Sequence, residues 1–305
     1  MIKKEFYIAG SDAKTKLHGF TWAPEGEVKA VLQLVHGMVE YIERYEPFAE
    51  YLTERGIAVI GHDHLGHGKS VTDEEKLGFF AEKDGANILI ADMLIVTGKG
   101  KTDFPGKPFY ILGHSMGSFL VRRYMASYSK EIDGAVIMGT GWIPAGLAGF
   151  GRTVAKLISK TKGQMHRSKL LTTLALGSNN KPFEPARTPN DWLSKNEANV
   201  DRYNADPLCG YMFTSAAYVD FFTVLRSIAK EEGYDTIRKD LPVLIVAGEK
   251  DPVGGPAACE NVKAQYEKLG LTDITMKLYQ DDRHEILNED DRETVYGDIY
   301  AWLTK

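Results

Sequence analysis

A serine between two glycines is the feature of this sequence that most directly suggests chemistry. The pentapeptide Gly113-His114-Ser115-Met116-Gly117 fits the G-x-S-x-G pattern and lies between the apolar run FYIL and the helical pattern SFLVRRYMASY. Glycine on either side lets the backbone turn sharply, which leaves the serine hydroxyl exposed beside a helix N-terminus that favours negative charge. We therefore predict a nucleophile elbow with Ser115 at its tip. The alternative is a small residue packed among glycines.

A serine hydroxyl becomes a good nucleophile when a base takes its proton and a carboxylate orients that base. In the G-x-S-x-G setting, the acid and then the histidine follow the serine along the chain. Asp251 opens a turn after the run Pro242–Ala247, and Glu249 is the reserve candidate for the acid. His284 follows the run Ile274–Tyr279, and the sequence has no other histidine after the proposed acid. We predict Asp251 and His284 as the partners of the serine.

Two backbone amides must hold the oxygen that becomes negative when an ester carbonyl is attacked. The amide of Met116, directly after the serine, is one candidate. The loop after Ala30–Val35 reads HGMVEY and offers the amide of Met38 as the other, with Gly37 beside it as a substrate contact.

The run HDHLGH at residues 62–67 suggests zinc binding as an alternative chemistry. Its spacing resembles the H-x-H-x-D-H signature of metallo-β-lactamases, but Gly66 stands where the aspartate should be. We interpret this run as structural, with Gly66 and Gly68 permitting a tight turn, and we predict no metal site. His36 and His114 are interpreted in the same way, as structural hydrogen-bonding groups.

These candidate residues need a frame, and the sequence favours a mostly parallel sheet covered by helices, because short apolar runs alternate with longer helical patterns. The predicted strands are Ala30–Val35, Ile57–His62, Pro108–Gly113, Gly134–Met138, Pro242–Ala247 and Ile274–Tyr279. Phe6–Ala9 and His18–Trp22 predict an antiparallel hairpin at the edge of the sheet. Helices are predicted at Arg44–Arg55, Asn87–Gly98 and Ala257–Leu269.

The alternation stops between residues 140 and 230, where helical patterns occur without strands in a stretch too long for an ordinary loop. We predict a helical cap at 140–230, inserted into a core formed by 1–139 and 231–305. Residues 141–182 carry Lys and Arg but no Asp or Glu. The apolar residues of the cap either pack it onto the core or line a tunnel; those expected to contact substrate are Trp142, Ile143, Leu147, Phe150 and Leu174.

The bulk composition excludes some functions. The net charge of −5 gives no general attraction to nucleic acid. Neither a signal peptide nor a membrane-spanning run is recognisable, and Cys209 and Cys259 are expected to be free buried thiols, so we expect a cytoplasmic protein. The sequence does not define an oligomeric state.

Six blocks carry a family resemblance: HGMVEYIERY, GHDHLGHGKS, GHSMGS, DPLCG, GEKDPVGG and RHEILNE. In this order they resemble the monoacylglycerol lipase and lysophospholipase-like branch of the α/β-hydrolases. The resemblance implies an eight-stranded sheet with a helical cap and hydrolysis of acyl esters through an acyl-enzyme, without metal or organic cofactor. It also implies Ser115, Asp251 and His284 as the triad, with the amides of Met38 and Met116 as the oxyanion hole.

Two positions depart from the family pattern. Tyr41 replaces the usual histidine of HGxxEH, and Asp281-Asp282 stand where a small or glycine-containing turn is usual. One hypothesis is that this acidic pair raises the basicity of His284.

The leading interpretation is a monoacylglycerol lipase acting on a small acyl ester, with transient peripheral contact between the basic cap and an anionic lipid surface. A lysophospholipase, a carboxylesterase for aryl or cinnamoyl esters, and a ligand-binding receptor on the same fold are the alternatives. An aminopeptidase is disfavoured because residues 141–182 offer no carboxylate for a substrate ammonium, and a dehalogenase because its nucleophile is an aspartate.

Overall fold

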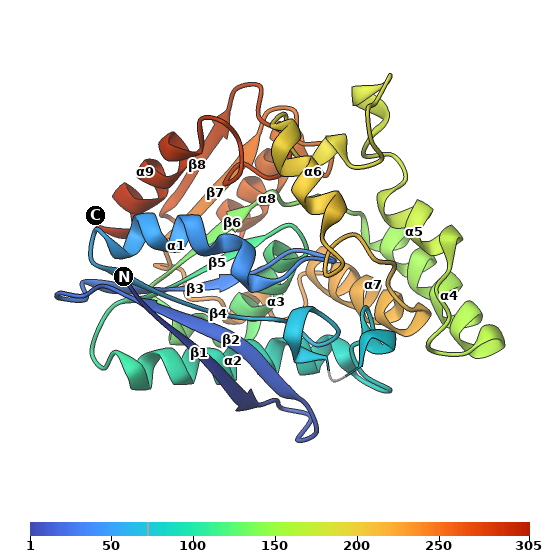
Figure 1. The fold of residues 1–305 in the computed structure, drawn as a ribbon, viewed down its shortest axis with the longest axis horizontal. Coiled ribbons are helices and arrows are strands. Elements are labelled where there is room, and N and C mark those ends of the chain that lie inside the picture. Colours follow the sequence, from blue (N-terminus) through green and yellow to red (C-terminus); the bar gives the residue numbers. More distant parts are fainter. Residues whose placement is uncertain (72) are drawn as a thin grey trace.

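The computed structural model describes residues 1–71 and 73–305, and in this part of the chain eight strands form one sheet (Figure 1). The strand order is β1-β2-β4-β3-β5-β6-β7-β8. β2 is antiparallel to β1 and β4, whereas all neighbours from β4 to β8 are parallel. The strands are β1 Ile2–Ala9, β2 Lys16–Ala23, β3 Ala30–Val35, β4 Ile57–His62, β5 Phe109–His114, β6 Gly134–Met138, β7 Val243–Gly248 and β8 Ile274–Tyr279.

The predicted strands are confirmed, with two shifted starts that have a common cause. β5 and β7 begin one residue after Pro108 and Pro242. The carbonyl of each proline accepts a hydrogen bond from the neighbouring strand, at Val31 N (2.9 Å) and Ala135 N (3.0 Å). Proline has no N–H to return, so the regular ladder starts one residue later.

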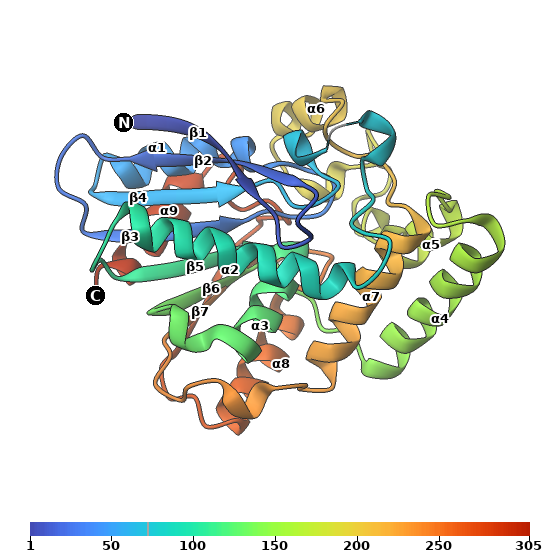
Figure 2. The ribbon, with the colours of Figure 1, turned by 90° about the horizontal axis from the view of Figure 1, so that it is seen from below.

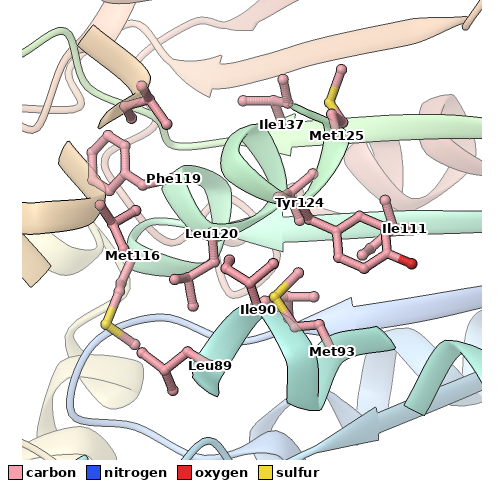
Figure 3. Packing of buried hydrophobic residues seen from close by; sticks show 14 of the residues in the cluster. Leu89, Ile90, Met93, Ile111, Met116, Phe119, Leu120, Tyr124, Met125 and Ile137 are labelled. Carbon is pink, nitrogen blue, oxygen red and sulfur yellow. The ribbon is translucent and has the colours of Figure 1, made fainter. Parts of the chain in front are cut away.

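Helices cover both faces of the sheet, which explains why its central strands are buried on both sides. One face packs against α1 (Glu46–Thr53) and α9 (Arg292–Leu303). The other packs against α2 (Gly85–Asp103), α3 (Met116–Tyr128) and α8 (Gly255–Lys268). Figure 3 shows this second core, where Leu89 and Met93 of α2 lie close to Leu120 of α3.

Residues 139–242 are all described and contain four α-helices and no strand beyond an isolated bridge. The helices are α4 Ala145–Lys162, α5 Lys169–Leu176, α6 Glu197–Ala205 and α7 Ser215–Ala229. They gather on the side toward which the arrow of β4 points (Figure 2). Within the described residues, no helix is long and apolar enough to cross a bilayer.

Candidate active site

The backbone at Ser115 has the strained conformation of an elbow. Ser115 lies between β5 and α3 with φ 53° and ψ −119°, a positive φ that non-glycine residues rarely adopt. A Cβ atom on Gly113 would lie 2.3 Å from the Gly117 carbonyl oxygen, and one on Gly117 would lie 2.0 Å from the carbonyl oxygen of Val35. Both flanking glycines are therefore required for α3 to approach β3 and β5 this closely.

The predicted base and acid are in contact. His284 Nδ1 lies 2.9 Å from Asp251 Oδ1, and both side chains are buried. Because a carboxylate only accepts, Nδ1 carries the hydrogen and Nε2 has a free lone pair. Nε2 has no hydrogen-bond partner among the described residues, and His284 lines the same cavity as Ser115. Glu249, the reserve acid, is exposed instead.

His114, the residue before the serine, supports the loop that carries His284. His114 Nε2 lies 3.1 Å from the His284 carbonyl oxygen, and His114 Nδ1 lies 2.9 Å from the Tyr45 hydroxyl and 3.3 Å from Glu40. Burial lowers the pKa of His114, but the hydrogen bond and charge of Glu40 outweigh burial and raise it. His114 is therefore a hydrogen-bonding support, as predicted.

The loop after β3 is held by hydrogen bonds on both sides of Met38. The Gly37 amide donates to Glu40 Oε1 (2.6 Å), and the Val39 amide donates to His67 Nε2 (3.2 Å). Val39 has a positive φ of 50°. Its carbonyl accepts from the Gly210 amide at 3.0 Å. This arrangement fixes a strained loop directly beside the elbow.

Neither the amide of Met38 nor the amide of Met116 donates a hydrogen bond to any described residue. Both residues line the cavity that contains Ser115. A Cβ on Gly37 would lie 3.3 Å from the Cβ of Ser115, so the loop passes immediately beside the serine. Two free N–H groups on either side of a serine are what a tetrahedral oxyanion needs.

The cavity has a volume of about 460 Å³. The apolar side chains that line it include Phe119, Ile143, Leu147, Phe150, Leu174, Phe221, Phe222, Leu225 and Val253. Its polar lining residues include Thr172, Thr173, Ser178, Asn179 and Asn190. Of the predicted substrate contacts, Gly37, Ile143, Leu147, Phe150 and Leu174 line the cavity. Trp142 does not, and its side chain is partly exposed.

Comparison with known proteins agrees with this geometry. The model of the family described as "Serine aminopeptidase, S33" (Hydrolase_4) matches residues 26–291. The chain belongs to this family. It is 27% identical over 285 residues to a monoacylglycerol lipase of Mycolicibacterium smegmatis, and this alignment covers 92% of this chain and 90% of the relative. It is 26% identical over 291 residues to a monoglyceride lipase of Homo sapiens, covering 93% of this chain and 85% of the relative.

Solved structures share the fold. A carboxyl esterase from Bacillus coagulans in complex with glycerol superposes with a TM-score of 0.91 at 24% identity, over 100% of this chain and 98% of that chain. A soluble variant of monoglyceride lipase from Saccharomyces cerevisiae in complex with a substrate analog superposes with a TM-score of 0.77 at 21% identity, over 99% of this chain and 95% of that chain. The protein is thus a serine hydrolase of the α/β-hydrolase class and an ester hydrolase.

In this hydrolase, the HDHLGH run is built into the core under the loop of Met38. His64 N donates to His36 Nε2 (3.0 Å), and Asp63 accepts from His18 Nδ1 (2.7 Å). Gly66 has a positive φ of 73°, as the predicted tight turn requires. Among the described residues, no group of three or more potential ligands is arranged to hold a metal ion.

Sequence reasoning missed a charged network that joins the loop of Met38 to the loop of His284. Arg44 donates to both oxygens of Glu285 at 2.9 Å and to Glu40 at 2.5 Å. Burial raises the pKa of Glu285, but the positive charge of Arg44 outweighs burial and lowers it. The signal was present, because all three residues lie inside the HGMVEYIERY and RHEILNE blocks.

The two departures from the family pattern have structural uses. The Tyr41 hydroxyl donates to Asp206 at 2.7 Å, which ties the loop of Met38 to the DPLCG segment. Asp281 pairs with Lys250 at 2.5 Å, and Asp282 pairs with Lys195. The hypothesis that this acidic pair raises the basicity of His284 finds no support, because lysines engage both carboxylates.

Proposed function

We propose that Ser115, His284 and Asp251 hydrolyse carboxylic esters through an acyl-enzyme. The observation that carries the proposal is the bonding of His284: Nδ1 is engaged by Asp251, while Nε2 has no partner among the described residues and the ring borders the cavity of Ser115. His284 accepts the hydroxyl proton as Ser115 attacks the ester carbonyl, and it then returns the proton to the leaving alcohol. Water releases the acid by the same steps in reverse.

The amides of Met38 and Met116 are the proposed oxyanion hole. Within the described part of the chain, both are free of other hydrogen bonds, and both residues line the cavity that contains the serine. A donor of this kind is worth on the order of 3 kcal/mol of transition-state stabilisation. Because the donors are backbone groups, the methionine side chains are replaceable.

The proposed substrate is a neutral ester with a medium or long acyl chain, in the simplest case a monoacylglycerol. The apolar side chains that line the cavity suit the acyl chain, and polar lining residues such as Asn179 and Asn190 suit a hydroxylated alcohol. The two similar lipases are named for this substrate class.

The lysophospholipase alternative loses its main support. None of the described residues that line the cavity is a lysine or arginine, so a phosphate group would find no countercharge there. The two lining carboxylates, Glu40 and Glu285, are already bonded to Arg44. Binding energy inside the cavity therefore favours an uncharged alcohol.

We further propose that residues 140–230 act as a cap over the core of 1–139 and 231–305, and that helices α4 and α5 contact lipid. Their apolar side chains are exposed at Leu147, Leu157 and Leu170, by 60%, 62% and 56%. Lysines such as Lys156 share α4, and residues 141–182 contain no acid. Exposed apolar side chains on a segment that carries cations and no acids suit the surface of an anionic membrane.

A hydrolysis panel tests the assignment: monoacylglycerols of several chain lengths, lysophosphatidylcholine and a short aryl ester, each with Ser115→Ala as control. We expect long monoacylglycerols to be cleaved fastest and the alanine variant to be inactive. Fast cleavage of the aryl ester alone would overturn the lipid substrate and retain the triad. Equal rates for wild type and Ser115→Ala would overturn the nucleophile.

A further inference from the structure

Two segments far apart in the sequence meet beside the proposed base. One is residues 191–196, between β6 and β7, and the other is the loop at 282–291 that carries His284. Glu289 lies at their junction, and its side chain is fully buried. The mechanism proposed above gives this carboxylate no part, so its position needs another explanation.

Hydrogen bonds from both segments converge on Glu289. Its Oε2 accepts from Ser194 Oγ at 2.7 Å and from the Lys195 amide at 3.0 Å. Its Oε1 accepts from the Arg283 amide at 2.9 Å. Every partner is a donor, which suits a carboxylate because its two oxygens only accept. One buried side chain thus joins the two backbones.

The segment at 191–196 also touches the base itself. The ring of Trp192 lies 5.0 Å from the ring of His284 between centroids, at 39°. The Glu285 amide, next to the base, donates to the Leu193 carbonyl at 2.7 Å. The indole therefore forms one wall of the space that His284 occupies.

We propose that Glu289 is a positioning residue for His284, acting through the amide of Arg283 and through the segment at 191–196. The inference rests on the proposed function only in taking His284 as the base. Glu289 fixes the peptide that precedes His284, and the segment it holds presses Trp192 against the imidazole. Both contacts preserve the direction in which Nδ1 meets Asp251.

This inference divides the proposed cap into two parts. Residues 191–196 belong to the site of the base and stay with it. The cavity therefore opens by movement of α4 and α5 and not of the 191–196 segment. Displacing that segment would break the bonds to Glu289 and disturb His284.

Glu289→Gln is the first test. The amide places an N–H group against N–H and O–H donors and so weakens the junction while keeping the side-chain volume. With a short aryl ester, we expect kcat to fall on the order of tenfold to hundredfold, because a small misplacement of a catalytic group is costly. KM should change by less than about twofold, since the substrate does not touch Glu289.

Fluorescence of Trp192 supplies a readout that needs no turnover. Trp192→Phe identifies the part of the emission that comes from this indole, whose ring lies 5.0 Å from the ring of His284. Glu289→Gln should make this indole more accessible to acrylamide, a soluble quencher, because the 191–196 segment is no longer held in place.

Three further variants decide between positioning and simpler roles. Glu289→Asp keeps the charge but is one methylene shorter, so we expect it to lose kcat as Glu289→Gln does. Ser194→Ala removes one bond and should show a smaller loss, which keeps the test valid if Glu289→Gln does not fold. Asp92→Asn is the matched control, since Asp92 is a buried carboxylate on α2 that bonds to Ser11 instead.

The outcomes separate cleanly. If Glu289→Asp retains the full kcat, only the charge of Glu289 matters, and the proposal is overturned. A lower melting temperature with unchanged kcat and unchanged acrylamide quenching of Trp192 would leave a purely structural residue and also overturn it. If wild type cleaves no ester while the quenching of Trp192 still depends on Glu289, the proposed function fails and the hold of Glu289 on the segment beside His284 is retained.

Discussion

The two sides of the cavity differ in how the chain between β6 and β7 meets the rest of the molecule. On the side of His284, residues 191–196 are joined to the loop at 282–291 by short, directional hydrogen bonds to Glu289 and from Arg283. On the opposite side, α4 exposes Leu147 and Phe150 at 60% and 58%.

The contacts of α4 are mostly apolar and small. Ala148, Gly151 and Ala155 are buried, and a Cβ on Gly151 would lie 2.8 Å from the ring of Phe222 in α7. Among the described residues, the only hydrogen bond from an α4 side chain to another element runs from Arg152 to Thr223, at 2.8 Å. Apolar contact is non-directional and tolerates sliding, whereas hydrogen bonds fix angles. The comparison suggests a fixed side for the chemistry and an adaptable side for substrate entry.

The strongest way to test the fixed side is to change its acid. Asp251→Asn should lower kcat by about 10⁴-fold, because the amide no longer holds the imidazole in the productive tautomer. Steady-state hydrolysis of a short aryl ester measures the loss. Glu249→Gln is the matched control at the exposed reserve position. If Glu249→Gln loses most of its activity while Asp251→Asn stays active, the acid is Glu249 and the assignment of Asp251 is wrong.

A second change tests the charged network on the same side. Arg44→Met leaves Glu285 buried without its cation and should lower the free energy of unfolding by about 3–5 kcal/mol. Urea denaturation measures the change. Arg152→Met on α4 should alter stability by less than about 1 kcal/mol, because its guanidinium is only partly buried and bonds to a hydroxyl. Similar values for the two variants would contradict the difference between the sides.

Acid should weaken the core beneath the loop of Met38 through buried His62. Burial lowers the pKa of His62 to about 3, so the folded state stays unprotonated where the unfolded chain takes up a proton. The stabilising contribution is complete above the ordinary value near 6.5 and is lost as the pH falls toward 3. His62→Gln removes this loss, so its stability relative to wild type should improve by about 1.4 kcal/mol per pH unit below 6.5. Urea titrations at pH 7, 6 and 5 give the difference, and a constant offset would refute the prediction.

The smallest effect is expected on the adaptable side. Leu157 on α4 is 62% exposed and does not line the cavity, so Leu157→Ser should change stability by less than about 0.5 kcal/mol. Turnover of a dissolved aryl ester should be unchanged, while binding to anionic vesicles and hydrolysis of vesicle-borne monoacylglycerol should fall. Equal binding to neutral and anionic vesicles by the wild type would contradict the lipid contact.

The sequence predicted the frame well because that frame depends on local patterns. Continuous apolar runs marked the parallel strands, and the glycines around Ser115 marked the elbow. The helix α9 was missed, although its buried residues follow a helical spacing from Val295 to Leu303. The two free thiols, Cys209 and Cys259, are buried as predicted.

What the sequence by itself determined is the identity and order of the proposed reacting groups, since the proposed nucleophile, acid and base each lie in a short motif at the end of a strand. What only the tertiary structure decided is how these groups are held. Arg44 and Glu285 form an ion pair although 241 positions separate them in the sequence. Arg283 donates to the Asp191 carbonyl although 92 positions separate them. No local periodicity encodes such pairs, because they depend on which elements the closed fold brings together at the cavity.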